Sequence, residues 1–180
     1  AANRKASSES SEPTTQIESL PQSVAAVSAP IGERYAYFGD LHVHTTYSMD
    51  AFNFGTLATP DDAYRYARGD AIKHPGGFEM QLKRPLDFYA VTDHGFYLGV
   101  VRAGADTTTE ISNYPAMQRI HNLNAPKNLT LESIPTRNFR AFIGAFRKDM
   151  ANSDPLKAEV QRIMRTTWAD EVRAADQHYV

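Results

Sequence analysis

Residues 38–50 read Phe-Gly-Asp-Leu-His-Val-His-Thr-Thr-Tyr-Ser-Met-Asp, and this stretch decides the fold class and the candidate site. Successive side chains of a β-strand point to opposite faces, so His42 and His44 project to one side, together with Asp40. Imidazole nitrogen suits transition-metal ions, and carboxylate oxygen suits harder ions. Asp50 follows across a polar turn and can fold back toward the same point. The stretch therefore indicates a strand that carries half of a metal site.

A second segment, 86–94, reads Leu-Asp-Phe-Tyr-Ala-Val-Thr-Asp-His. Its near-continuous apolar character through Thr92 is typical of a strand buried on both faces of a parallel sheet. It ends in Asp93 and His94, and ligands and catalytic groups of α/β folds collect at the carboxyl ends of parallel strands. The alternative is a structural role, in which Asp93 caps a turn and His94 is a partly buried histidine.

The run 39–48 resembles the first motif of the PHP (polymerase and histidinol phosphatase) superfamily, and Val-Thr-Asp-His at 91–94 resembles its second motif. The similarity covers about 35–99 and is greatest to a long, mostly uncharacterised branch of the superfamily. It implies an α/β fold, a distorted (β/α)7 barrel of the TIM type. It also implies a centre of two or three metal ions (zinc, manganese or iron) and hydrolysis of phosphate esters by a water whose pKa falls from 15.7 toward roughly 7.

The resemblance also implies roles for the candidate residues. The expected metal ligands are His42, His44, Asp50 and His94. The superfamily often has its aspartate at the position of Met49, and Asp50 stands one residue later. Asp93 and His94 are the expected catalytic residues, with His94 on the metal and Asp93 supporting it. Asp40 lies on the same face of the expected strand as the two histidines, and we expect it to orient an imidazole without binding the metal itself.

The later motifs of the superfamily have no counterpart in the sequence after residue 95. These motifs are a bridging glutamate, further histidines, and a final His-x-Asp or Asp-x-His. None of the later glutamates, Glu110, Glu132, Glu159 and Glu171, ends an apolar strand run. Two strands with several helices cannot close a barrel and would leave unpaired edges. We therefore expect residues 35–180 to be the amino-terminal part of a PHP-like metallohydrolase domain that continues beyond Val180.

Composition narrows the classes of partner. A net charge of −2 and a pI of about 6.3 give no basic field for nucleic acid. Zero cysteines exclude disulfides and thiolate ligands. No apolar run reaches the roughly 18–20 residues of a membrane-spanning helix. The expected partner is a small, anionic ester, with neither nucleic acid nor a membrane. Residues 1–34 contain nine Ser/Thr, three Pro and no aromatic residue. This composition predicts a disordered leader or a linker that followed a removed secretion signal. A removed signal would favour a periplasmic or secreted protein over a cytoplasmic one.

Local signals predict the remaining elements. A first strand is expected over 35–44. A helix is predicted over 60–68, and Gly69 is expected to end it. Its start is marked by Thr59 as N-cap, by Pro60 at the first helical position and by Asp62 three residues after the cap. An irregular excursion over 70–84 would complete the crossover to the second strand. Apolar spacing predicts helices over 139–146 and 155–178.

The excursion carries three residues that can face an anionic substrate: His74, Lys83 and Arg84. The alternative is that each lies in a solvated loop. Two other function classes also stay open. An amidohydrolase-type barrel likewise starts with His-x-His on its first strand, and it would hydrolyse C–N or C–O bonds. A PHP-like domain without activity would be a metal-binding or interaction module.

Overall fold

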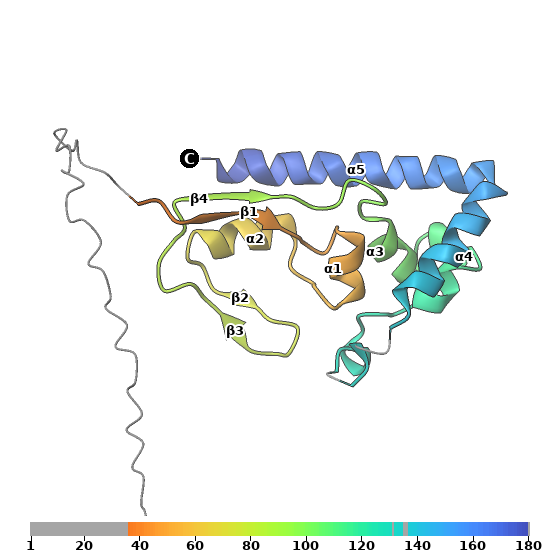
Figure 1. Cartoon of the computed structure of the whole chain (residues 1–180), viewed down its shortest axis with the longest axis horizontal. Helices are drawn as coiled ribbons and strands as arrows, with labels where there is room; N and C mark the ends of the chain where they lie inside the picture. Colours follow the sequence, from red (N-terminus) through yellow and green to blue (C-terminus); the bar gives the residue numbers. More distant parts are fainter. Residues whose placement is uncertain (1–35, 131, 135–136, 180) are drawn as a thin grey trace, which may run out of the picture. The chain divides into compact units, whose positions relative to one another are not determined.

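The computed structural model describes residues 36–130, 132–134 and 137–179, and it has a mixed α/β architecture. The leader expected over 1–34 lies outside the described residues. Strands β1 (Gly39–Val43) and β4 (Phe88–Val91) form a parallel pair (Figure 1), as the two histidine segments predict. The first strand begins later than the expected residue 35.

An irregularity interrupts the pairing of β1 with β4. Gly39 pairs with Phe88 and Asp40 with Tyr89, but the next pair is Val43 with Val91, so β1 carries one extra residue between these pairs. Such a bulge breaks the strict alternation of side chains. The regular pairing of β1 with β4 is therefore interrupted between Asp40 and Val43.

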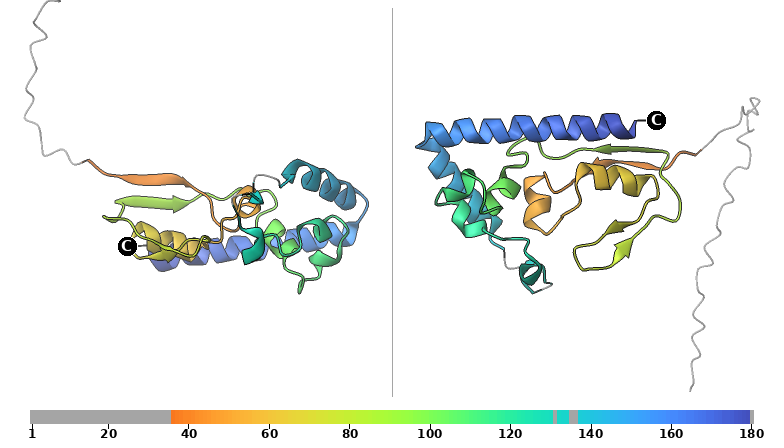
Figure 2. Two further views of the ribbon diagram at one scale, coloured as in Figure 1. Left: turned by 90° about the horizontal axis from the view of Figure 1, so that it is seen from below. Right: turned by 180° about the vertical axis from the view of Figure 1, so that it is seen from behind.

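The expectation that β4 is buried on both faces is wrong for this chain. Phe88 is 44% exposed, and Leu41 of β1 is 62% exposed. The reason is that helices α2 (Pro60–Ala67) and α5 (Asp154–His178) pack together and against β4 on the same side of the strand pair (Figure 2, left). The other side of the pair has no such cover among the described residues.

Helix α2 begins with the predicted capping box. The side chain of Asp62 accepts the backbone N–H of Thr59 (3.0 Å), and the hydroxyl of Thr59 accepts the backbone N–H of Asp62 (3.2 Å). Pro60 occupies the first helical turn, and Gly69 follows the helix with φ 93°. Both terminal signals are therefore confirmed, and the helix ends one residue before the predicted Arg68.

The excursion over 70–84 is not wholly irregular. Strands β2 (Ile72–Lys73) and β3 (Glu79–Met80) pair antiparallel in a short hairpin. The backbone N–H of His74 donates to Phe78 O (2.8 Å), and that of Gly77 donates to His74 O (2.9 Å). Gly77 has φ 91°, which glycine adopts without strain. Each of these strands has only two residues, so the sequence shows no alternating pattern of apolar and polar side chains that would predict it.

The remaining regular elements of the described chain are helices. The α-helices are α1 (Met49–Asn53), α3 (Val100–Ala105), α4 (Phe139–Ala151) and α5, and the 3₁₀ helices are η1 (Ile111–Asn113), η2 (Met117–Ile120) and η3 (Pro126–Asn128). The predicted helix over 155–178 begins at Asp154, where Ser153 accepts the N–H of Leu156 (3.3 Å). No described helix has the length and apolarity needed to cross a membrane.

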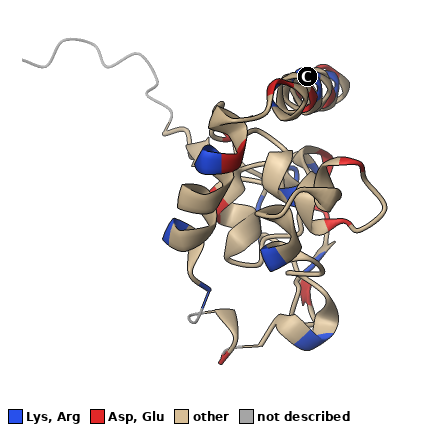
Figure 3. Cartoon of the chain, turned by 90° about the vertical axis from the view of Figure 1, so that its right-hand side faces the viewer, with Lys and Arg blue, Asp and Glu red and all other residues tan. Residues whose placement is uncertain are grey.

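Helix α5 carries both acidic and basic residues (Figure 3). Three ion pairs with a spacing of three residues join Asp154 to Lys157, Glu159 to Arg162 and Asp170 to Arg173, with N–O distances of 2.5–2.7 Å. Pairs at this spacing give a helix modest support and keep its surface mixed in charge.

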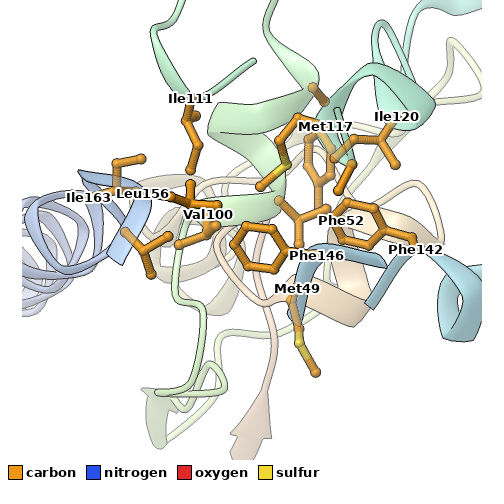
Figure 4. Close-up of a cluster of buried hydrophobic side chains, with 14 residues drawn as sticks. Met49, Phe52, Val100, Ile111, Met117, Ile120, Phe142, Phe146, Leu156 and Ile163 are labelled. Atoms are coloured by element: carbon orange, nitrogen blue, oxygen red, sulfur yellow. The ribbon is translucent and has the colours of Figure 1, made fainter. Parts of the chain in front are cut away.

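One apolar core joins α1, α3, α4 and α5 to the 3₁₀ helices η1 and η2 (Figure 4). Phe146 is 1% exposed and stacks on Phe142 with ring centroids 5.9 Å apart. Met49 and Phe52 of α1 belong to the same core. The core therefore fixes the short helix that carries Asp50.

Replacing Phe146 with Ala should destabilise the protein by about 3–5 kcal/mol, because it leaves a cavity in this core. Urea unfolding followed by circular dichroism measures the change. Phe38→Ala, at a side chain that is 63% exposed, is the control and should change stability by less than about 0.5 kcal/mol. A loss below about 1 kcal/mol for Phe146→Ala would contradict this packing.

Candidate metal centre

Three of the predicted ligands converge. His44 follows β1, Asp50 lies on α1 and His94 follows β4, and each offers a ligand atom within 4.8 Å of the others. His94 Nε2 lies 3.1 Å from one oxygen of Asp50, and His44 Nδ1 lies 3.8 Å from the other. Two donors on one tetrahedral zinc ion, each at 2.0–2.2 Å, lie about 3.3 Å apart, which is close to the 3.1 Å between His94 Nε2 and Asp50. The donor set of two imidazoles and a carboxylate therefore fits a divalent metal ion.

The buried hydroxyl of Ser48 connects all three residues. It donates to Asp50 (2.9 Å), accepts the backbone N–H of His94 (3.3 Å) and lies 2.7 Å from His44 Nδ1. Because its single proton points to Asp50, His44 Nδ1 is the donor of that third contact. The Nε2 lone pair of neutral His44 is then free for a metal ion. Sequence analysis gave Ser48 no role.

Asp50 is held as an anion. Burial alone would raise the pKa of Asp50, but hydrogen bonds from Ser48 and the backbone N–H of Ala51, together with His94 and His44, lower this pKa below its ordinary value. Metal ions bind the ionised carboxylate. Asp50 is therefore ready as a ligand at neutral pH.

Asp93 ties the two histidine segments together. One oxygen of its carboxylate accepts the backbone N–H of Thr45 (2.5 Å), and the other accepts the hydroxyl of Thr45. Thr45 is fully buried and directly follows His44, and Asp93 directly precedes His94. The predicted supporting role of Asp93 thus has a structural counterpart in the backbone beside both histidines.

Glu171, on α5, forms a hydrogen bond with Asp93. Burial raises the pKa of Glu171 on α5 to about 8, and Asp93 adds to the rise through a hydrogen bond and its charge. Glu171 Oε1 is buried, with no hydrogen-bond partner among the described residues. No local pattern marks Glu171 in the sequence, because only the packing of α5 brings it to Asp93.

His42 and Asp40 lie beside the three-residue cluster rather than in it. The exposed ring of His42 lies 5.1 Å from that of His44, between centroids, in line with the expectation that the two rings are neighbours. Asp40 accepts the backbone N–H of His42 (2.8 Å). The described contacts of Asp40 therefore hold the β1 backbone and do not orient an imidazole.

The three residues considered for substrate contact do not gather at the cluster. His74 stacks on Phe78 in the hairpin, with ring centroids 4.3 Å apart. Lys83 and Arg84 are exposed in the segment between β3 and β4. The other histidines are also elsewhere: His121 contacts Ser112 O (2.9 Å), and His178 contacts Asp61 (2.7 Å).

A protein-family model described as "Protein of unknown function (DUF3604)" matches residues 32–180. The chain belongs to the DUF3604 family. The match spans both histidine segments, α1 and α5, so every residue of the candidate centre lies inside the DUF3604 region. No curated protein and no solved structure matches the chain.

Replacing Ser48 with Ala should weaken binding of zinc about 10- to 100-fold, because the variant loses the hydroxyl that orients His44 and Asp50. Competition with a chromophoric chelator measures the affinity. His121→Gln is the control and should bind as the wild type does. Equal affinities of Ser48→Ala and the wild type would show that this hydroxyl does not organise the ligands.

Glu171 should make stability depend on pH. Because its pKa of about 8 exceeds the ordinary value of 4.5, the folded protein binds more protons than the unfolded protein between these values. The stabilisation is complete below about pH 4.5 and is lost as the pH rises through about 8. Glu171→Gln should therefore be more stable than the wild type at pH 8, with the difference closing toward pH 5.

Urea unfolding at pH 5, 6.5 and 8 measures this effect. Glu159→Gln is the control on the same helix, because a hydrogen bond from Arg162 lowers the pKa of Glu159. Parallel pH profiles for Glu171→Gln and the wild type would contradict the assignment.

Proposed function

We propose that this DUF3604 protein is a metal-dependent hydrolase of the PHP type that acts on a small anionic ester, with phosphate esters as the leading class. The observation that carries the proposal is the convergence of His44, Asp50 and His94 at the carboxyl ends of a parallel strand pair. The Gly-Asp-Leu-His-Val-His and Val-Thr-Asp-His motifs that resemble the PHP superfamily supply two of these three residues.

Zinc, manganese or iron held by His44, Asp50 and His94 would polarise a phosphoryl oxygen and lower the pKa of a water molecule. Ser48 orients two of these side chains. Thr45 and Asp93 hold the strand ends that carry the histidines at a fixed separation. Glu171, protonated below about pH 8, holds a proton beside the Asp93 carboxylate.

Two exposed side chains border the cluster and suit a substrate or a further ion. The ring of Phe96 lies 5.0 Å from that of His94, between centroids, and is 52% exposed. It would pack on the organic part of an ester. His42 would contribute to a further ion in a centre of two or three metals, because its imidazole faces that of His44.

The proposal includes a larger sheet. The strand pair would form part of a distorted (β/α)7 barrel, in which further strands pair with its open edges. The support is exposed apolar surface on the strand pair: Leu41 is 62% exposed and Phe88 is 44% exposed. Contact with neighbouring strands would remove this surface from water.

The protein should hydrolyse an aryl phosphate such as 4-nitrophenyl phosphate or its diester with zinc or manganese, and excess chelator should abolish the activity. His44→Ala and Asp50→Asn should each lower kcat/KM by roughly a hundredfold or more, because each loses a ligand. His121→Gln is the matched control.

Three results would redirect the proposal. Full turnover in chelator would exclude the metal mechanism. Activity on amides or lactones but not on phosphates would identify the amidohydrolase class. Metal binding without turnover on any of these substrates would favour a non-catalytic metal-binding module.

A further inference from the structure

A recess of about 610 Å³ lies away from the metal ligands, between the β2–β3 hairpin and the segment after α1. We call it the hairpin recess, and its apolar wall includes Phe54, Leu57, Ile72, Met80 and Leu129. A second hollow of about 530 Å³ adjoins it and shares Leu57, Ile72 and Leu129. No residue of the His44–Asp50–His94 cluster lines either hollow.

The size and wall chemistry of the hairpin recess match those of small-molecule sites. Such sites enclose about 300–1,000 Å³ and have mostly apolar walls with a few polar groups. Phe54 and Phe78 are each 56% exposed there, and Leu57 is 40% exposed. Large apolar side chains that face water in one concavity favour a ligand with an apolar body.

Two polar side chains of the recess, those of Lys73 and His74, can donate hydrogen bonds. His74 Nδ1 accepts the backbone N–H of Gly76 (2.9 Å), so the neutral ring carries its proton on Nε2. Stacking on Phe78 and the turn of the hairpin hold this ring in place. Lys73, the preceding residue, is exposed and lines the same recess. Together they offer a cation and an N–H group at one side of an apolar wall.

No acidic residue is among the described residues that line the hairpin recess. Asp62 lines the adjoining hollow, but one of its oxygens accepts the N–H and hydroxyl of Thr59 (3.0 and 2.8 Å). Its other oxygen lies 3.7 Å from Arg65. Lys73 is therefore the one charged residue among the described residues that line the hairpin recess, and Glu79, which lies opposite Lys73 in the hairpin, does not line it.

We propose that the hairpin recess binds a small molecule with an aromatic or aliphatic body and one anionic group. The body would lie against Leu57, Ile72 and Met80, and the anion would meet Lys73 and His74. This site is separate from the metal centre, and the inference does not depend on the hydrolase proposal.

The test is a titration with naphthalene-2-carboxylate and with its neutral amide, followed by calorimetry in the presence of chelator. The acid should bind with a stoichiometry of one and about tenfold more tightly than the amide. The double variant Lys73→Gln/His74→Phe should lose about tenfold in affinity for the acid and keep its affinity for the amide. Leu57→Trp should fill the recess and lose binding of both compounds.

Two controls place the binding. Lys148→Gln, a matched change on α4, should bind the acid as the wild type does. His44→Ala should also bind normally, because the carboxylate does not act as a metal ligand there. Circular dichroism spectra equal to that of the wild type show that the variants fold.

The proposal is wrong if neither compound binds, if acid and amide bind equally, or if the double variant binds the acid as the wild type does. It is also wrong if sedimentation shows a dimer that Leu57→Trp dissociates while neither compound binds. The recess would then be covered by a second copy of the chain.

Discussion

The carboxylate of Asp93 accepts two hydrogen bonds from Thr45, across 48 residues of chain, and the candidate centre depends on this contact. Hydrogen bonds to a charged group typically contribute about 1.5–3 kcal/mol each. Here they also set geometry, because Thr45 follows His44 and Asp93 precedes His94. Backbone pairing of only two strands, with an irregularity in β1, would fix this geometry less firmly. Glu171 packs against Asp93 from α5, so the longest helix is coupled to the same point.

The third ligand is positioned in another way. Asp50 lies on a five-residue helix, and isolated helices of that length are unstable in water. Met49 and Phe52 place α1 in the apolar core, and Ser48 directs the carboxylate toward both histidines. A packed core, a buried hydroxyl and a clamped strand pair thus hold three side chains where one ion can bind them. Such support is what separates a metal site from a chance cluster.

Features with a local cause could be predicted from the sequence. The capping box at Thr59, the start of α5 near Pro155 and the neighbouring rings of His42 and His44 all follow from spacing. The expected burial of β4 on both faces was wrong because, among the described residues, α2 and α5 cover only one side of the strand pair. The hairpin of β2 and β3 was missed because its strands are too short to show a period. Glu171 gave no signal, since its position depends on how α5 packs over the strand pair.

The most direct test of the central claim, that His44, Asp50 and His94 form one metal site, is a crystal structure with zinc or manganese and anomalous diffraction data at the metal edge. We predict an anomalous peak within bonding distance of His44, Asp50 and His94, with the contact of Asp93 to Thr45 intact. A peak at other residues only, such as His74 or His178, or no peak at saturating metal, would contradict the account.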